Sequence, residues 1–350
     1  MTTPGSDSYT VGLTADGAYP DGYTIFGDVG LERLTDAGIS WVVMPELHAP
    51  VPPEALAGYD AILSFGHMPF PVDLVKQLPR LKHVARFGAG YDGIDPVGLG
   101  AEGVLVTTTP RAVRGPVALS GLTFLLALSH RLIENHRVTA TGQWATERGK
   151  HRGIGLAGRT VGIVGFGGIG SHFAELALGL GVRVIAHDRF GGTERATQLG
   201  VDLVDLEMIA RQSDFVVVTA ALTDQSHHMI DAAFIGQMKP SAYLISIARG
   251  GLIDQRALYE ALRDHHIAGA GLDVFEPEPP APDDPLLKLD NVILSPHALC
   301  WTEDFTRDVS ASVMESIIDV SHGRVPAAVL NRATLLESWR GANLASATVQ

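Results

Sequence analysis

Three polar side chains in the second half of the chain are of types that suit chemistry on a bound anion. Arg249, Glu278 and His297 each follow a stretch typical of a β-strand, and in an open parallel sheet ligands bind at the carboxyl ends of the strands. A guanidinium binds a carboxylate through two parallel hydrogen bonds. An imidazole exchanges protons near neutral pH, and a neighbouring carboxylate stabilises its charged form. Taken singly, Arg249 could equally be an ion-pair partner, Glu278 a solvated acid and His297 a structural histidine. A functional interpretation therefore depends on the sequence that precedes them.

A glycine-rich motif lies upstream of these residues. Gly165, Gly167 and Gly170 form the pattern G-x-G-x-x-G, after a β-branched run at 160–164 and before an apolar helical stretch at 171–180. The first glycine permits a tight turn, the second lets a pyrophosphate approach the backbone, and the third allows the helix to pack closely on the strand. Free N–H groups at the helix N-terminus favour phosphate. In this context the motif predicts a dinucleotide site.

An acidic residue completes the predicted cofactor site. The stretch 182–186 is typical of a second strand, and Asp188 follows it at the spacing at which a carboxylate accepts hydrogen bonds from the adenosine ribose. Because a carboxylate repels a 2′-phosphate, Asp188 favours NAD over NADP. The adjacent Arg189 weakens this preference.

The composition indicates two domains and no general affinity for polyanions. A chain of 350 residues, 46% of them hydrophobic, can bury a large core, and the net charge of −13 argues against a nucleic-acid or membrane-surface binder. The single cysteine, Cys300, excludes an intrachain disulfide and suits a reducing cytosol, so we expect a cytoplasmic protein. Residues 1–9 lack the pattern of a signal peptide, and the longest apolar stretch, 117–128, is short for a membrane span.

Strand-like and helix-like stretches alternate along the chain, which predicts an α/β fold with parallel sheets. A first α/β unit extends from residue 10 to about 110, and a second begins with the strand at 160–164. Between them we expect a long helix at 117–139, opened by Pro116. Strands are predicted at 41–44, 61–64, 83–87, 104–107, 160–164, 182–186, 215–219, 242–247, 268–274 and 292–294, and a late helix at 302–321.

Two other groups of residues allow a binding site without requiring one. Gly88 and Gly90 follow a predicted strand, and successive N–H groups there could hold a carboxylate, although by itself this segment is more typical of an ordinary strand-to-helix turn. The histidine pairs at 227–228 and 265–266 have no His-Glu-x-x-His pattern and no cysteine partner, so we expect no metal site.

Five motifs in order give the chain a specific resemblance to a known family. They are Phe87-Gly88-Ala89-Gly90-Tyr91-Asp92-Gly93-Ile94-Asp95, Gly165-Phe166-Gly167-Gly168-Ile169-Gly170, Ala248-Arg249-Gly250-Gly251-Leu252-Ile253-Asp254, Gly271-Leu272-Asp273-Val274-Phe275-Glu276-Pro277-Glu278-Pro279 and Ser295-Pro296-His297. Over about residues 55–330, the chain resembles the D-isomer-specific 2-hydroxyacid dehydrogenases. That family includes phosphoglycerate dehydrogenase, hydroxypyruvate and glyoxylate reductases, and formate dehydrogenase.

The resemblance implies two Rossmann-like or flavodoxin-like parallel-sheet domains with a cleft between them. Residues 1–110 would form the first part of the substrate-binding domain and 111–298 an inserted NAD-binding Rossmann domain. The chain would return to the substrate-binding domain at 299–335 and end in a tail at 336–350. The long helix from Val117 would lie in the interface of a homodimer.

The resemblance also assigns roles to individual residues. His297 would be the catalytic acid or base, Glu278 its partner, and Arg249 would bind the substrate carboxylate and polarise its carbonyl. The cofactor-binding residues would be Gly165, Phe166, Gly167, Gly168, Ile169, Gly170, Asp188, Ala220, Ile247, Ala248 and Asp273. The substrate would also contact Gly88, Ala89 and Gly90.

We therefore expect an enzyme that transfers hydride reversibly between C2 of a D-2-hydroxy acid and C4 of NAD, with a small 2-hydroxy or 2-keto acid as its partner molecule. Two alternatives stay open. One is a non-enzymatic NAD(H)-sensing module, as in transcriptional corepressors that resemble this family. The other is an enzyme that oxidises formate or phosphite. The residues do not identify the acid.

Overall fold

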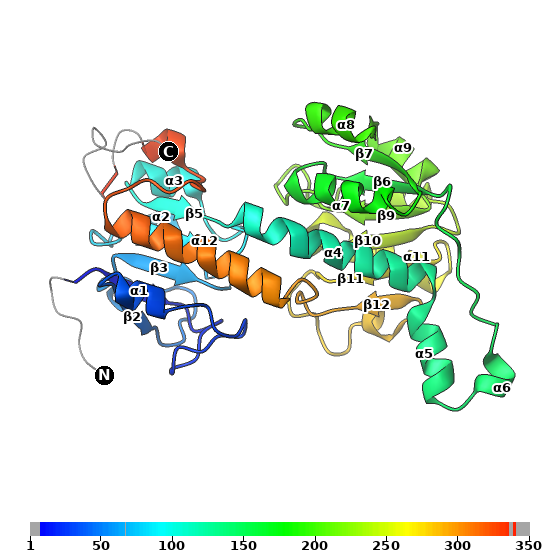
Figure 1. Cartoon of the computed structure of the whole chain (residues 1–350), viewed down its shortest axis with the longest axis horizontal. Helices are drawn as coiled ribbons and strands as arrows, with labels where there is room; N and C mark the ends of the chain where they lie inside the picture. The colour runs from blue at the N-terminus through cyan, green and yellow to red at the C-terminus, as the bar shows by residue number, and fades with distance from the viewer. Residues whose placement is uncertain (1–7, 67, 336–338, 341–350) are drawn as a thin grey trace. The chain divides into compact units, whose positions relative to one another are not determined.

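The chain folds into two compact units. The computed structural model describes residues 8–66, 68–335 and 339–340 (Figure 1). The first unit consists of Met1–Val113 and Trp301–Gln350, and the second of Arg114–Cys300. The predicted boundaries after residues 110 and 298 lie three and two residues before those of the units. Each unit contains a parallel sheet, so the predicted fold class of two parallel-sheet α/β domains is confirmed.

The first unit contains a five-stranded parallel sheet in the order β2-β1-β3-β4-β5. Its strands are β1 (Thr10–Leu13), β2 (Ser40–Val43), β3 (Ala61–Ser64), β4 (His83–Arg86) and β5 (Leu105–Thr107). Strand β1 was not predicted. It is buried throughout, and Val11 pairs with Trp41 of β2 on one side and Ala61 of β3 on the other. The helices of this part are α1 (Glu32–Asp36), α2 (Val72–Val75) and α3 (Pro96–Ala101).

The C-terminal part of the chain completes the first unit. Helix α12 (Glu303–Ser321) begins where Thr302 accepts a hydrogen bond from the N–H of Phe305. After it, the Asn331 amide accepts from the N–H of Val106 at 3.1 Å and donates to the carbonyl of Val104 at 2.8 Å, which ties the segment to β5. Helix α13 (Arg332–Leu335) follows.

Most of the predicted tail at 336–350 lies outside the described residues. The two residues that are described, Trp339 and Arg340, belong to the fold. Trp339 is buried in a cluster with Leu105 and Leu335, and Arg340 donates to the carbonyl of Leu78 at 2.7 Å. The first unit therefore extends at least to Arg340.

The second unit contains a seven-stranded parallel sheet in the order β12-β11-β10-β9-β6-β7-β8. Its strands are β6 (Thr160–Val164), β7 (Arg183–His187), β8 (Asp202–Leu203), β9 (Phe215–Val218), β10 (Tyr243–Ser246), β11 (Gly269–Leu272) and β12 (Val292–Leu294). The order reverses between β6 and β9, and ligands of such sheets bind at the carboxyl ends of the strands at this switch point. Strand β9, which was predicted to be central, is the fourth of the seven.

Helices cover both faces of this sheet, as a buried parallel sheet requires. Side chains alternate along β9: Phe215 and Val217 belong to one apolar cluster, and Val216 and Val218 to the other. The helices are α4 (Pro110–Ser129), α5 (Leu132–Ala140), α6 (Trp144–Glu147), α7 (Gly168–Leu178), α8 (Thr193–Leu199), α9 (Leu206–Gln212), α10 (Ala232–Gly236) and α11 (Gln255–Arg263). Helix α11 is capped by Asp254, as predicted.

The long helix differs from its prediction. Helix α4 (Pro110–Ser129) begins before Pro116, which lies inside it at the loss of one backbone hydrogen bond. It ends before Arg131, whose left-handed backbone (φ 48°) separates α4 from α5. The C-terminal part of α4 packs on the sheet where two glycines leave room, because a Cβ at Gly121 would press on Ile247 and one at Gly271 on Phe124.

Within the described residues, α4 is the one helix that is long and apolar enough to cross a membrane, with a mean hydropathy of 1.5 over an 18-residue window of its 20 residues. The apolar stretch at 117–128, which was expected to be too short for a span, is part of a longer helix that includes seven residues before Val117. Of the apolar window, 56% is buried inside the structure. Core helices of soluble proteins pass the same test of length and composition, so this property is weak support for a membrane span.

Candidate active site

The glycine-rich turn between β6 and α7 has the backbone that a dinucleotide site requires. Gly165 has a φ of 97°, and a Cβ there would lie 2.5 Å from the backbone of Ala220, after β9. A Cβ at Gly170 would collide with the carbonyl oxygen of Gly165, so only glycine lets α7 approach the turn. At Gly167, in contrast, a Cβ would meet no heavy atom within 4 Å. The open side of the turn and the N-terminus of α7 therefore fit a pyrophosphate.

Asp188 lies at the carboxyl end of β7 and binds the same turn. One carboxylate oxygen accepts a hydrogen bond from the N–H of Phe166 at 2.6 Å. The other accepts from the N–H groups of Phe190 at 2.8 Å and Gly191 at 3.2 Å. These bonds hold the carboxylate beside the glycine-rich turn. Its predicted bond to the ribose stays a prediction, as does the role of Arg189, whose guanidinium lies over the Phe190 ring.

His297 and Glu278, which were predicted as partners, form a hydrogen-bonded pair. His297 Nδ1 lies 2.8 Å from Glu278 Oε2, and Glu278 Oε1 accepts from the N–H of Phe275 at 2.8 Å. The carboxylate is thus held by its own loop and orients the ring. Since an ionised carboxylate only accepts hydrogen bonds, we assign the proton to Nδ1, and Nε2 of the neutral ring is then the nitrogen that can accept a proton.

Asp273 positions the histidine loop, a role that the sequence did not reveal. It follows β11, is 3% exposed, and its Oδ1 accepts from the N–H groups of Ala298 at 3.1 Å and Leu299 at 3.3 Å. Burial raises its pKa, while hydrogen bonds from Ser295 and from these N–H groups oppose the rise. The available signal was an acid within the mostly apolar stretch at 268–274 that was predicted as a strand. Its predicted contact with the nicotinamide end of NAD stays a prediction.

Arg249 follows β10 in an extended conformation, and its Nη1 donates to the carbonyl of Ala248 at 2.6 Å. The next residue, Gly250, packs against the backbone of Phe275, so the Arg249 loop and the Glu278 loop touch. Arg249 and Asp273 both act on the buried Cys300 thiol. Burial raises the pKa of this thiol to about 12, Asp273 adds to the rise, and Arg249 opposes it.

The remaining predicted contacts divide between the two units. In the second unit, Ile247 is buried and Ala248 half-buried at the end of β10, and Gly168 and Ile169 open α7. The Gly88–Gly90 turn belongs to the first unit.

The Gly88–Gly90 turn is supported by a buried arginine. Gly88 has a φ of 124°, and the carbonyls near it are engaged. Arg86 Nη1 donates to the carbonyls of Phe65 and Phe87, both at 2.6 Å, and to that of Ser64 at 3.1 Å. The carbonyl of Gly88 accepts from the N–H of Thr109 at 2.9 Å. Arg86 was not predicted as part of this turn.

A second group of ligand-type side chains comes together near the Arg249 and Glu278 loops. One donor atom from each of His227, His228 and Glu276 lies within 4.8 Å of the others. The expectation of no metal site was drawn from local sequence spacing alone, and it missed this cluster because His228 and Glu276 are 48 positions apart in the sequence.

Comparison with known proteins agrees with the fold. Residues 122–298 match the model of the family described as D-isomer specific 2-hydroxyacid dehydrogenase, NAD binding domain. The chain is 37% identical over 281 residues to a glyoxylate reductase of Korarchaeum cryptofilum, covering 80% of this chain and 85% of that protein.

Two solved structures show the same architecture. D-lactate dehydrogenase from Aquifex aeolicus, complexed with NAD and lactic acid, superimposes with a TM-score of 0.78 at 25% identity, covering 95% of this chain and 99% of that one. An NADPH-dependent glyoxylate/hydroxypyruvate reductase from Sinorhizobium meliloti superimposes with a TM-score of 0.77 at 28% sequence identity. The match covers 93% of this chain and 98% of that one. The chain therefore belongs to the D-isomer specific 2-hydroxyacid dehydrogenase family of NAD(P)-dependent oxidoreductases, and its second unit contains the NAD binding domain.

Proposed function

We propose that this enzyme reduces a small 2-keto acid to the D-2-hydroxy acid with NADH, and that His297 is the acid that protonates the new hydroxyl. The observation that carries the proposal is the oriented pair of His297 and Glu278, 2.8 Å apart, on a loop held by Asp273. A neutral ring with its proton on Nδ1 presents a basic Nε2, and a second proton there makes it the acid.

The remaining residues have complementary roles in this proposal. Bound NADH would supply the hydride. Glu278 stabilises the imidazolium, and Arg249 binds the substrate carboxylate and the carbonyl oxygen on which charge develops. In this proposal Gly88, Ala89 and Gly90 also contact the substrate. The turn from Gly165 to Gly170, with Ala220, Ile247 and Ala248, binds the cofactor, Asp188 the ribose and Asp273 the nicotinamide end.

The experiment is steady-state oxidation of NADH over a panel of 2-keto acids that includes glyoxylate, hydroxypyruvate and pyruvate. We expect His297→Gln to lower kcat by about 10²–10⁴-fold, the usual contribution of a positioned acid, with NADH binding by fluorescence unchanged. Glu278→Gln keeps an acceptor for Nδ1 but loses the charge, so its effect should be smaller. His266→Gln, which changes an exposed histidine of the same unit, is the matched control. Undiminished turnover by His297→Gln contradicts the proposal.

The same assay separates the alternatives. NADH binding without turnover of any 2-keto acid would favour a sensing module. Reduction of NAD on addition of formate or phosphite would favour oxidation of those anions. Replacing NADH with NADPH measures the cofactor preference.

We also propose that the protein is a cytoplasmic homodimer. The large apolar side chains at 119 and 126 are 51% and 36% exposed, and their spacing of seven places them on one stripe of α4. An exposed apolar stripe of this kind is typical of a protein interface. The single cysteine is in keeping with a reducing cytosol.

A further inference from the structure

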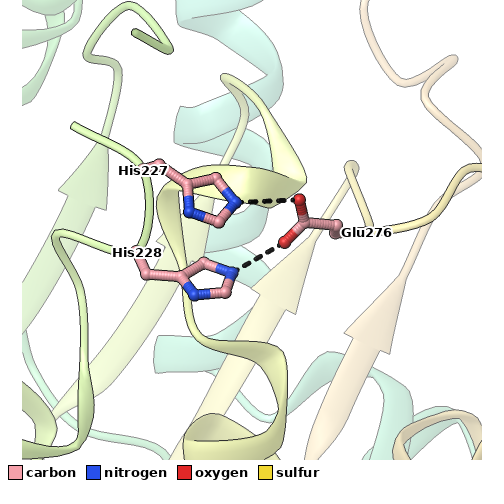
Figure 2. A group of neighbouring side chains, drawn as sticks. All are labelled: His227, His228 and Glu276. Carbon is pink, nitrogen blue, oxygen red and sulfur yellow. Dashed lines mark hydrogen bonds and ion pairs between the residues drawn. The ribbon is translucent and has the colours of Figure 1, made fainter. Parts of the chain in front are cut away.

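We infer that His227, His228 and Glu276 form a binding site for a late first-row transition-metal dication, of which Zn²⁺ is the type. His227 Nε2 lies 3.1 Å from Glu276 Oε1, and His228 Nε2 lies 2.8 Å from Glu276 Oε2. Figure 2 shows both rings directing a nitrogen at the same carboxylate. In the part of the chain that the structure describes, no other group of three or more histidine, cysteine or acidic side chains is as closely placed.

The backbone is shaped to bring two consecutive histidines to one side. Side chains of neighbouring residues in extended chain point in opposite directions. His228 instead has a φ of 52°, and the two rings stack with their centroids 3.8 Å apart. This conformation is unfavourable for a residue with a Cβ. It is held by a hydrogen bond from the N–H of His228 to the carbonyl of Gly251 at 2.8 Å. Strain of this kind, localised at a cluster of ligands, is a mark of a functional site.

The cluster connects the loops that follow β9, β10 and β11. The histidines lie after β9, and Glu276 lies after β11, where its N–H donates to the Gln255 side chain at 3.2 Å. The loop after β10 packs against both, since a Cβ at Gly251 would lie 3.1 Å from Glu276 Oε1 and 3.4 Å from the His227 ring. Glu278 is two residues from Glu276, and Arg249 is two residues from Gly251, which packs against the cluster. An ion here would join the loops that carry the proposed active site without using its side chains.

The chemistry of the three donors selects the ion. Imidazole nitrogen with one carboxylate suits Zn²⁺, Co²⁺ and Ni²⁺, whereas Mg²⁺ and Ca²⁺ prefer oxygen ligands.

The donors are nearly at coordination distance already. Bonds of about 2.0–2.1 Å to a tetrahedral ion place two ligands about 3.3 Å apart, close to the 2.8 and 3.1 Å observed between nitrogen and oxygen. Binding requires the stacked rings to tilt toward each other and replaces the two hydrogen bonds to Glu276. The side chains of His227, His228 and Glu276 are 47%, 41% and 42% exposed, so an ion reaches them from solvent and water completes the coordination.

The test is metal binding by the full chain after treatment with a chelator. Titration with Co²⁺, followed by its visible absorption, and with Zn²⁺, followed by calorimetry, should give one equivalent per chain. Loss of an outer-shell partner usually weakens metal sites 10–100-fold, so loss of a ligand in His228→Gln or Glu276→Gln should weaken binding by about 100-fold or more. Zn²⁺ should raise the Tm of the parent and leave that of these variants unchanged.

The pair at 265–266 provides the matched control, because it also consists of adjacent histidines with a left-handed residue, His265 at φ 53°. His265→Gln should bind one equivalent as tightly as the parent. Circular dichroism and NADH binding show whether each variant folds. If His228→Gln does not fold, His227→Gln tests the site instead, because it leaves the left-handed residue His228 unchanged. No stoichiometric binding by the parent, or equal binding by His227→Gln and the parent, would overturn the inference. Neither result depends on turnover, so the proposed function stands or falls separately.

Discussion

His83 gives the first unit a dependence on pH whose size can be worked out from the structure. It opens β4, has no exposed surface, and its Nε2 lies 2.8 Å from the hydroxyl of Thr107 in β5. That hydroxyl lies 3.3 Å from the hydroxyl of Ser316 in α12, so the three residues join two strands to the returning helix. Within the described residues, Nδ1 has no hydrogen-bond partner. Burial lowers the pKa of His83 from 6.5 to about 3.

The sign follows from the proton each state binds. The folded state keeps His83 neutral down to about pH 3, while the unfolded chain takes up a proton below 6.5. The free energy of unfolding therefore falls as the pH is lowered from 6.5 toward 3. At pH 5, which is 1.5 pH units below the pKa of His83 in the unfolded chain, each pH unit lowers the free energy of unfolding by about 1.4 kcal/mol. The loss of stability from this residue is therefore on the order of 2 kcal/mol.

The perturbation is His83→Gln, which removes the titration and keeps a polar partner for Thr107. Urea unfolding at pH 7 and pH 5 measures the free energy in each protein. Adding Trp144→Phe to all proteins leaves tryptophans 41, 301 and 339, which belong to the first unit, as the fluorescent reporters. The parent should lose about 2 kcal/mol more than the variant between the two pH values. Other titrating groups contribute equally to both and cancel.

His48→Gln, a change at an exposed histidine of the same unit, should leave the parent's pH dependence unaltered. If His83→Gln and the parent lost stability equally between pH 7 and pH 5, the reasoning would be refuted. The buried ring would then have to accept a proton in the folded state.

Two further predictions concern the cofactor and the assembly. Asp188→Asn keeps an acceptor for the N–H of Phe166 but removes the charge that opposes a 2′-phosphate. The ratio of kcat/KM for NADPH to that for NADH should therefore rise about 10-fold or more, which corresponds to the free energy of one hydrogen bond to a charged group. An unchanged ratio would mean that Asp188 does not select the cofactor. Leu126→Glu places a charge in the exposed stripe of α4 and should convert the dimer to a monomer in size-exclusion chromatography with light scattering, whereas Leu203→Glu, at an exposed leucine on β8, should not. A parent that is already monomeric would contradict the interface.

Local patterns were sufficient for much of the second unit. The β-branched run at 160–164 and the short strand at 292–294 were predicted with the bounds of β6 and β12, and the cap at Asp254 was also predicted. The glycine-rich turn could also be predicted, because it depends on a local pattern. A φ of 97° at Gly165 is a property of a few consecutive residues, and its cause is the absence of a Cβ.

Other features depend on residues far apart in the chain. The four residues of β1 have no distinctive alternation, and they form a strand because β2 and β3 pair with them on both sides. Asp273 reaches the N–H of Ala298 across 25 residues because β11 and β12 are neighbours in the sheet. His228 meets Glu276 across 48 because β9, β10 and β11 lie side by side with their carboxyl ends together. Residue types and spacing determined which side chains were available for chemistry. The order of strands in the sheet decided which of them meet, since that order is set by the burial of whole elements and not by any local stretch.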